Sequence, residues 1–196
     1  MNRGIQGVLG VLLASLIACA GLAPAQAQGI RIVTFGDSGP AGNGVKTSEA
    51  YPAVLEATLR ARGVNATVQN ISTSGFKISD GLERVGQIPA GTQIVIVEFG
   101  SNDLRANMRA ADMNANMDAL LKKLRARNIE VIVMATRGID FAAVSSANGA
   151  TFVPYPASYK GYIQSTGRHL TPEGHRKAVE ELIMPALMPL LGRVKA

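Results

Sequence analysis

Cysteine, tryptophan and histidine are scarce in this sequence. Its 196 residues include one cysteine, two histidines and no tryptophan. A single cysteine cannot close an internal disulfide, so the stability of the fold must come from packing. The histidines, His169 and His175, lack metal-ligand spacing and a His-Glu-x-x-His context. We therefore expect no metal and no cofactor.

Aromatic residues and excess charge are limited as well. Aromatic residues make up 5% of the chain, and the formal net charge is +6. The one basic cluster, Lys122-Lys123-Leu124-Arg125-Ala126-Arg127, falls in a helical pattern and has no interleaved aromatic residues. Such a cluster indicates a solvated helix face and not a nucleic-acid footprint. We expect a monomer without a nucleic-acid partner.

Long hydrophobic runs are confined to the start of the chain. Arg3 precedes an apolar stretch over residues 8–22, and Ala25-Gln26-Ala27 then supplies a small-x-small cleavage site. The stretch is too short and wrongly flanked for a membrane span, so it predicts a secretory signal peptide over residues 1–27. We expect an exported protein, periplasmic or secreted, with no transmembrane segment after cleavage. The remaining residues, 28–196, are enough for one domain.

A second processing signal overlaps the first. Leu16-Ile17-Ala18-Cys19 resembles a lipoprotein cleavage box, and cleavage before Cys19 would leave a lipid-anchored protein. The well-formed Ala-x-Ala site downstream favours ordinary cleavage. Anchoring at Cys19 is the alternative.

Strand and helix patterns alternate along the rest of the chain. Near-continuous apolar runs such as Ile94-Val95-Ile96-Val97 are typical of strands buried on both faces of a parallel sheet, which predicts an α/β fold. Right-handed crossovers would place every strand-to-helix loop at one edge of that sheet. Pro185 and Pro189 are expected to bend or end the last helix early. The expected strands are 30–35, 66–71, 93–99, 130–135 and 151–153, and the expected helices are 48–62, 78–85, 112–127 and 172–191.

The tetrapeptide Gly36-Asp37-Ser38-Gly39 follows the first expected strand directly. A strand that ends in a tight turn at this edge of a parallel sheet presents the serine hydroxyl where α/β proteins place their chemistry. Ser38 is therefore the candidate nucleophile. Asp37 is interpreted as structural, bonding backbone groups of the turn.

Three later positions suit the other roles in acyl transfer. Gly75 follows the second strand, and Asn102 follows the third, so the Gly75 N–H and the Asn102 amide can join the Ser38 N–H in an oxyanion hole. His169 precedes the last helix and can serve as the base for Ser38. Glu98 and His175 are interpreted as structural residues.

In these motifs the chain resembles the SGNH/GDSL hydrolases, and the resemblance spans nearly all of the part after the signal peptide. The matching blocks, in order, are Phe35-Gly36-Asp37-Ser38, residues 70–82, residues 98–103 and residues 169–175. The resemblance implies a flavodoxin-like three-layer α/β/α sandwich around a five-stranded parallel sheet. It also implies a small secreted esterase, thioesterase or lysophospholipase, whose substrate is a small-molecule, lipid or glycan ester.

The chain departs from the family pattern three residues before His169. Where the family carries an aspartate, this sequence has Thr166. We expect a slow Ser38–His169 dyad, with Asp140 in the loop after the fourth strand as an alternative, displaced acid. Two other functions use the same residues: a catalytically silent protein that binds an acylated glycan or lipid, and an O-acyltransferase.

Overall fold

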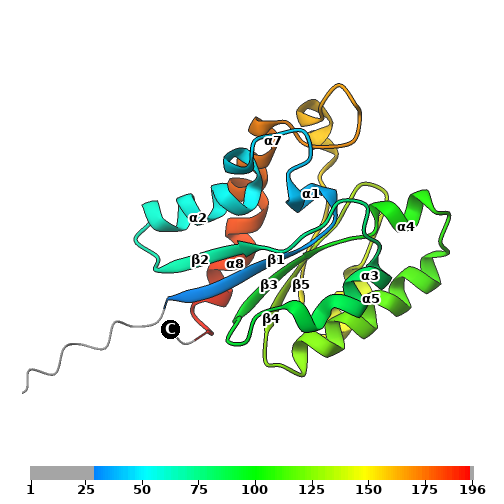
Figure 1. Cartoon of the computed structure of the whole chain (residues 1–196), viewed down its shortest axis with the longest axis horizontal. Coiled ribbons are helices and arrows are strands. Elements are labelled where there is room, and N and C mark those ends of the chain that lie inside the picture. Colours follow the sequence, from blue (N-terminus) through cyan, green and yellow to red (C-terminus); the bar gives the residue numbers. More distant parts are fainter. Residues whose placement is uncertain (1–28, 195–196) are drawn as a thin grey trace, which may run out of the picture.

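The computed structural model describes residues 29–194, which form a five-stranded, all-parallel sheet in the order β2-β1-β3-β4-β5 (Figure 1). This confirms the expected α/β class and strand number. The proposed signal peptide and Cys19 lie outside the described residues. The strands are β1 (Ile30–Gly36), β2 (Ala66–Asn70), β3 (Ile94–Glu98), β4 (Glu130–Met134) and β5 (Thr151–Val153).

Both faces of the sheet are apolar, and helices cover each of them. Side chains alternate along each strand, and those of Ile32 and Ile94 enter one core while those of Val33 and Val95 enter the other. The first core is covered by α2 (Tyr51–Ala61) and the C-terminal helices. The second is covered by α3 (Ile78–Arg84), α5 (Ala110–Arg125) and α6 (Ala142–Ala147). The result is the expected three-layer sandwich.

The C-terminal segment is helical over the range that the sequence predicted, and it contains both prolines. It runs through α7 (Pro172–Lys177), a π-helical stretch (Ala178–Ile183) and α8 (Met184–Leu191). The expected helix over 172–191 is confirmed in extent, and Pro185 and Pro189 do not end it early. Pro185 lies in the first turn of α8, directly after the π-helical stretch, where the N–H that proline lacks is least needed.

Several short helices at the sheet's edge and in its loops were not predicted. They are α1 (Ser38–Ala41), α4 (Ser101–Arg105), α6 and the 3-10 helix Ala157–Tyr162, while the 3-10 helices Thr47–Glu49 and Val85–Gln87 lie at the ends of the expected helices 48–62 and 78–85. Segments this short show no 3.6-residue periodicity in the sequence. Two of them matter for function, because α1 and α4 begin directly after β1 and β3 and carry candidate site residues.

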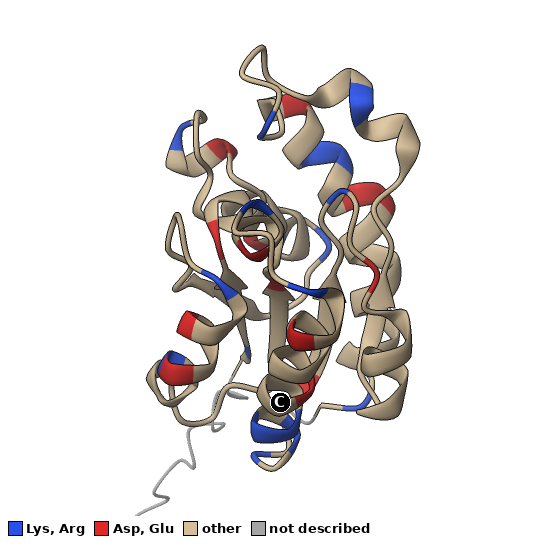
Figure 2. Ribbon diagram, turned by 90° about the vertical axis from the view of Figure 1, so that its right-hand side faces the viewer, with Lys and Arg blue, Asp and Glu red and all other residues tan. Residues whose placement is uncertain are grey.

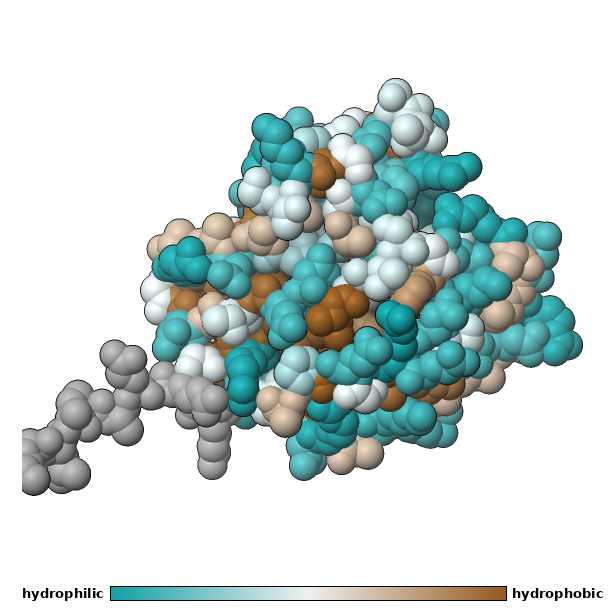
Figure 3. All heavy atoms as spheres, viewed as in Figure 1, coloured by the Kyte–Doolittle hydropathy of each residue, from teal (hydrophilic) through white to brown (hydrophobic). Residues whose placement is uncertain are grey.

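The surface mixes residue types. Basic and acidic residues are interspersed over the fold (Figure 2), and on the face shown in Figure 3 hydrophobic residues lie among hydrophilic ones. Within residues 29–194 no helix is both long and apolar enough to cross a bilayer.

Candidate active site

Ser38 is the first residue of α1, at the carboxyl end of the central strand β1. The Asp37 side chain caps this helix by accepting the Gly39 N–H at 3.1 Å. Ser38 is 6% exposed. The turn therefore holds the hydroxyl at the sheet edge, as the tetrapeptide predicted.

His169 lies next to this hydroxyl although it is far away in the sequence. Its Nε2 is 3.0 Å from the Ser38 Oγ. The loop that carries it is closed by the Gln164 N–H, which donates to the His169 carbonyl at 2.8 Å. The Gln164 side-chain amide also donates to the Asn43 carbonyl at 2.9 Å, just beyond α1. Gln164 thus ties the loop of His169 to the turn that carries Ser38.

The other ring nitrogen of His169 has no fixed partner. Among the described residues, no acceptor is hydrogen-bonded to Nδ1, and Thr166 is exposed without a hydrogen bond to His169. Burial lowers the pKa of His169, and the positive charges of Arg105 and Arg168 lower it further, against the opposing effect of Asp37. The imidazole is therefore held in its neutral form, which can accept a proton from Ser38.

Asp140 does not take the place of the missing acid in this structure. Its carboxylate accepts the Ala142 N–H at 2.8 Å at the start of α6. It is exposed and lies outside the set of residues that line the cavity at Ser38.

Asn102 lies against the nucleophile turn, with its amide engaged by protein groups. Its Nδ2 donates to the Phe76 carbonyl at 2.7 Å and to the Asp37 Oδ2 at 3.2 Å, and its Oδ1 accepts from Arg105. The Asp37 carboxylate also accepts the Ser101 hydroxyl at 2.6 Å. Asp37 therefore bonds its own turn, as the sequence predicted, and it also joins α1 to α4, which was not predicted.

Gly75 lies in the loop after β2 with a φ of +88°, a backbone conformation that favours glycine. Its N–H has no hydrogen-bond partner within the described residues. The neighbouring Ser74 hydroxyl donates to the Asn43 Oδ1 at 2.6 Å, which fixes this loop beside the end of α1. The Ser38 N–H, as the first of its helix, has no partner either.

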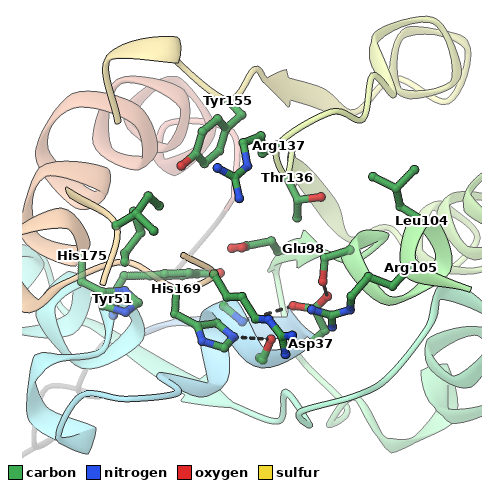
Figure 4. Close-up of a pocket in the computed structure, with 16 residues that line it drawn as sticks. Asp37, Tyr51, Glu98, Leu104, Arg105, Thr136, Arg137, Tyr155, His169 and His175 are labelled. Carbon is green, nitrogen blue, oxygen red and sulfur yellow. Dashed lines mark hydrogen bonds between the residues drawn. The ribbon is translucent and has the colours of Figure 1, made fainter. Parts of the chain in front are cut away.

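A cavity of about 290 Å³ opens beside Ser38 and His169 (Figure 4). Side chains from the ends of β1, β3 and β4 and from the loop before α7 surround it. Its polar and charged lining comprises Asp37, Ser38, Tyr51, Glu98, Ser101, Arg105, Thr136, Arg137, Tyr155, Arg168, His169 and His175.

Glu98, expected to be a structural carboxylate at its strand end, lines the cavity beside Ser38. It lies in the middle of this cavity in Figure 4, forms no ion pair within the described residues, and has the Tyr51 hydroxyl as the one neighbour that favours its charged form. A Cβ at Gly39 would overlap its Oε1, so the carboxyl packs against the residue after the nucleophile. Burial, with the charge of Asp37, raises the pKa of Glu98 to about 8.

Other buried polar atoms face the same region. The Thr136 hydroxyl and the His175 Nε2 are buried and form no hydrogen bond within the described residues, and the buried Tyr51 hydroxyl has only the Glu98 carboxyl as a neighbouring partner. His175 is fixed through its Nδ1, which accepts the Tyr51 N–H at 3.3 Å, and burial lowers its pKa to about 4. It is therefore a neutral, positioned side chain. In the described part of the chain, no cluster of His, Cys, Asp and Glu could hold a metal ion.

With this geometry established, comparison with known proteins identifies the family. A model of the GDSL-like lipase/acylhydrolase family matches residues 34–177. The chain belongs to this family. Similar proteins include the esterase TesA of Pseudomonas aeruginosa, which is 27% identical over 185 residues, 85% of this chain and 92% of that protein.

Solved structures of GDSL-like proteins match the fold closely. A crystal structure of TesA superposes with a TM-score of 0.75 at 25% identity, covering 82% of this chain and 99% of that one. AlinE4, an SGNH-hydrolase family esterase, gives a TM-score of 0.65 at 29% identity, covering 86% and 98%. The resemblance to SGNH/GDSL hydrolases in the sequence motifs is thereby confirmed.

Sequence reasoning missed several residues of this GDSL-like site. Gln164 gave no signal, because its role depends on a contact with Asn43 from a distant part of the chain. Arg105 and Arg137 each follow a recognised motif or strand by a few residues, and Arg168 directly precedes His169. Their convergence on one cavity could have been foreseen only from the shared sheet edge.

Proposed function

We propose that this GDSL-family chain hydrolyses carboxylic esters or thioesters through an acyl-enzyme on Ser38. The observation that carries the proposal is the 3.0 Å separation between the Ser38 Oγ and the His169 Nε2. This is hydrogen-bond distance, as a general base and its nucleophile require. The esterase names of TesA and AlinE4 support the same reaction class.

The chemistry follows from this pair. His169 accepts the Ser38 proton at Nε2 while Oγ attacks the ester carbonyl and forms a tetrahedral oxyanion. The intermediate collapses, the C–O or C–S bond of the ester breaks, and the imidazolium returns its proton to the leaving group. Water then attacks the acyl-enzyme with His169 as base again, which releases the acid and restores Ser38.

Three donors are proposed for the oxyanion. The Ser38 and Gly75 N–H groups have no partners in the described structure, so no internal hydrogen bond must break before they can donate. Asn102 would contribute by exchanging its longer bond, 3.2 Å to Asp37, for the oxyanion while keeping the 2.7 Å bond to the Phe76 carbonyl. Such donors act most strongly when they are held in place before reaction.

The absence of a fixed acid beside His169 makes a slow enzyme the expected outcome. An acceptor at Nδ1 selects the tautomer that can take the serine proton and stabilises the imidazolium. Thr166 makes no such contact here. This observation also favours the second candidate function, a silent protein that binds an acylated glycan or lipid. Acyl transfer to another hydroxyl would use the same two residues.

A fluorophosphonate labelling experiment on the purified protein separates these functions. Covalent labelling of Ser38, together with hydrolysis of p-nitrophenyl acetate, is expected for an esterase. Ser38→Ala and His169→Ala should reduce that rate by several orders of magnitude, as removal of either residue does in other serine hydrolases. Absence of labelling, with equal rates for wild type and Ser38→Ala, would contradict the proposal. Export after cleavage of residues 1–27 is proposed with it, on the pattern at the start of the chain.

A further inference from the structure

Three arginines surround the Ser38–His169 pair. Arg105 on α4, Arg137 after β4 and Arg168 beside the histidine all line the cavity. The Arg137 guanidinium donates to the Gly167 carbonyl at 2.9 Å, and that of Arg105 donates to the Asn102 side-chain oxygen. Both partners are neutral groups.

None of these three arginines forms an ion pair within residues 29–194. Elsewhere in the same fold arginines do find carboxylates. Arg60 pairs with Glu56 at 2.8 Å, and Arg125 pairs with Glu130 at 3.0 Å. In the described part of the chain Arg105, Arg137 and Arg168 have no such partner, so at this cavity their guanidinium groups remain available to an anion.

The acidic residues of the cavity do not neutralise these cations. Asp37 is committed to its own turn, where it accepts from Gly39, Ser101 and Asn102. Glu98, with its pKa raised to about 8, is mostly protonated at neutral pH. One buried carboxylate then faces three guanidinium groups, and the space beside the nucleophile carries a net positive charge.

This charge opposes the chemistry proposed for the site. The histidine must become positive as Ser38 gives up its proton, and the nearby charges of Arg105 and Arg168 disfavour that form. The position of Thr166 offers no compensating carboxylate. An anion held by the arginines would offset their positive charge. It would also supply the negative charge that the residue at position 166 does not provide.

We infer that the ester substrate carries a second, anionic group, a carboxylate or a phosphate, which binds to Arg105, Arg137 and Arg168 beside the reacting carbonyl. The inference rests on the proposed ester chemistry. The substrate itself then supplies the negative charge that an aspartate supplies in a full triad. Planar guanidinium groups suit both kinds of anion, since each can donate two parallel hydrogen bonds.

Two matched pairs of esters test the inference and locate the anion. On the alcohol side, 3-acetoxybenzoate is compared with its methyl ester. On the acyl side, monophenyl adipate is compared with methyl phenyl adipate. Within each pair the scissile ester is the same and the charge differs. Binding to the Ser38→Ala variant is measured first by calorimetry at pH 7, because that measurement needs no turnover.

We expect the anionic member of at least one pair to bind about tenfold more tightly than its neutral partner, as an interaction with partly exposed cations allows. With the Ser38 enzyme, kcat/KM should favour the same member by at least as much. The double variant Arg137→Gln/Arg168→Gln should abolish the preference. Arg62→Gln is the matched control, because this exposed arginine lies at the end of α2 and has no ion pair within the described residues.

The outcomes separate this inference from the proposed function. Equal binding of both members of both pairs overturns the inference, even if hydrolysis is fast. A preference that persists in Arg137→Gln/Arg168→Gln overturns it as well. Tighter binding of an anionic ester that is lost in the double variant supports the inference even if no ester is hydrolysed, in which case the esterase proposal fails by itself.

Discussion

The buried carboxyl group of Glu98 should make the stability of the fold fall as the pH rises. In the unfolded chain a glutamate titrates at its ordinary pKa of 4.5, whereas in the fold the pKa of Glu98 is about 8. Between these values the folded state binds more protons than the unfolded state, so stability is lost as pH increases. The contribution of Glu98 is therefore fully favourable below pH 4.5 and lost above pH 8.

The size of the effect follows from the same two pKa values. Their difference corresponds to about 4–5 kcal/mol. Water in the cavity and relaxation of nearby side chains reduce this penalty, and we expect about 2 kcal/mol between pH 5 and pH 8.5. For a domain of this size that is a fall in Tm of about 4–8 °C.

Thermal unfolding of wild type and Glu98→Gln across this pH range measures the contribution. Glutamine keeps the shape of the side chain and cannot ionise, so the difference between the two proteins isolates Glu98 from other groups such as His175. The variant should be more stable than wild type at pH 8.5 and close to it at pH 5. Glu83→Gln, at an exposed position on α3, is the control and should follow wild type. Parallel curves for wild type and Glu98→Gln would refute the reasoning.

Three further predictions concern the base, its environment and the chain's start. Thr166→Asp should raise kcat/KM by supplying an acceptor and a negative charge near His169, while Asp140→Asn should change kcat/KM little. If Thr166→Asp leaves kcat/KM unchanged and Asp140→Asn abolishes activity, Asp140 is the acid. Because burial and nearby arginines lower the pKa of His169, the acid limb of kcat/KM for a neutral ester should lie below the ordinary value of 6.5, and a limb above it would contradict the assigned electrostatics. Intact-mass analysis of the cell-envelope fraction should find a chain beginning at Gln28, and a diacylated species beginning at Cys19 would establish the lipoprotein alternative instead.

The sequence predicted the sheet and the candidate dyad because both depend on local patterns. Apolar runs such as that of β3 mark strands buried on both faces. Right-handed crossovers in a parallel sheet place the loops after its strands at one edge, and this brings Ser38 and His169 together. The separation of 3.0 Å between their side chains is consistent with that expectation.

Features that depend on contacts between distant segments could not be predicted in this way. Glu98 ends an apolar strand like many structural carboxylates, and only the packing against Gly39 and the surrounding residues show that its carboxyl group lines the cavity at Ser38. Within the expected helix over 172–191, the π-helical stretch Ala178–Ile183 has no sequence signature. The unpaired state of the arginines likewise requires knowledge of every nearby carboxylate.

The separation of the dyad along the chain has a consequence for biosynthesis. Ser38 is made early, but its partner is 131 residues further on, and the loop that holds His169 is anchored to Asn43 by Gln164. A growing chain can therefore pair its first strands while the nucleophile still lacks a base. The dyad can close only after nearly the whole domain has been synthesised and its C-terminal part has docked on the sheet. A reagent that labels only activated serine would thus distinguish completed molecules from nascent or truncated ones.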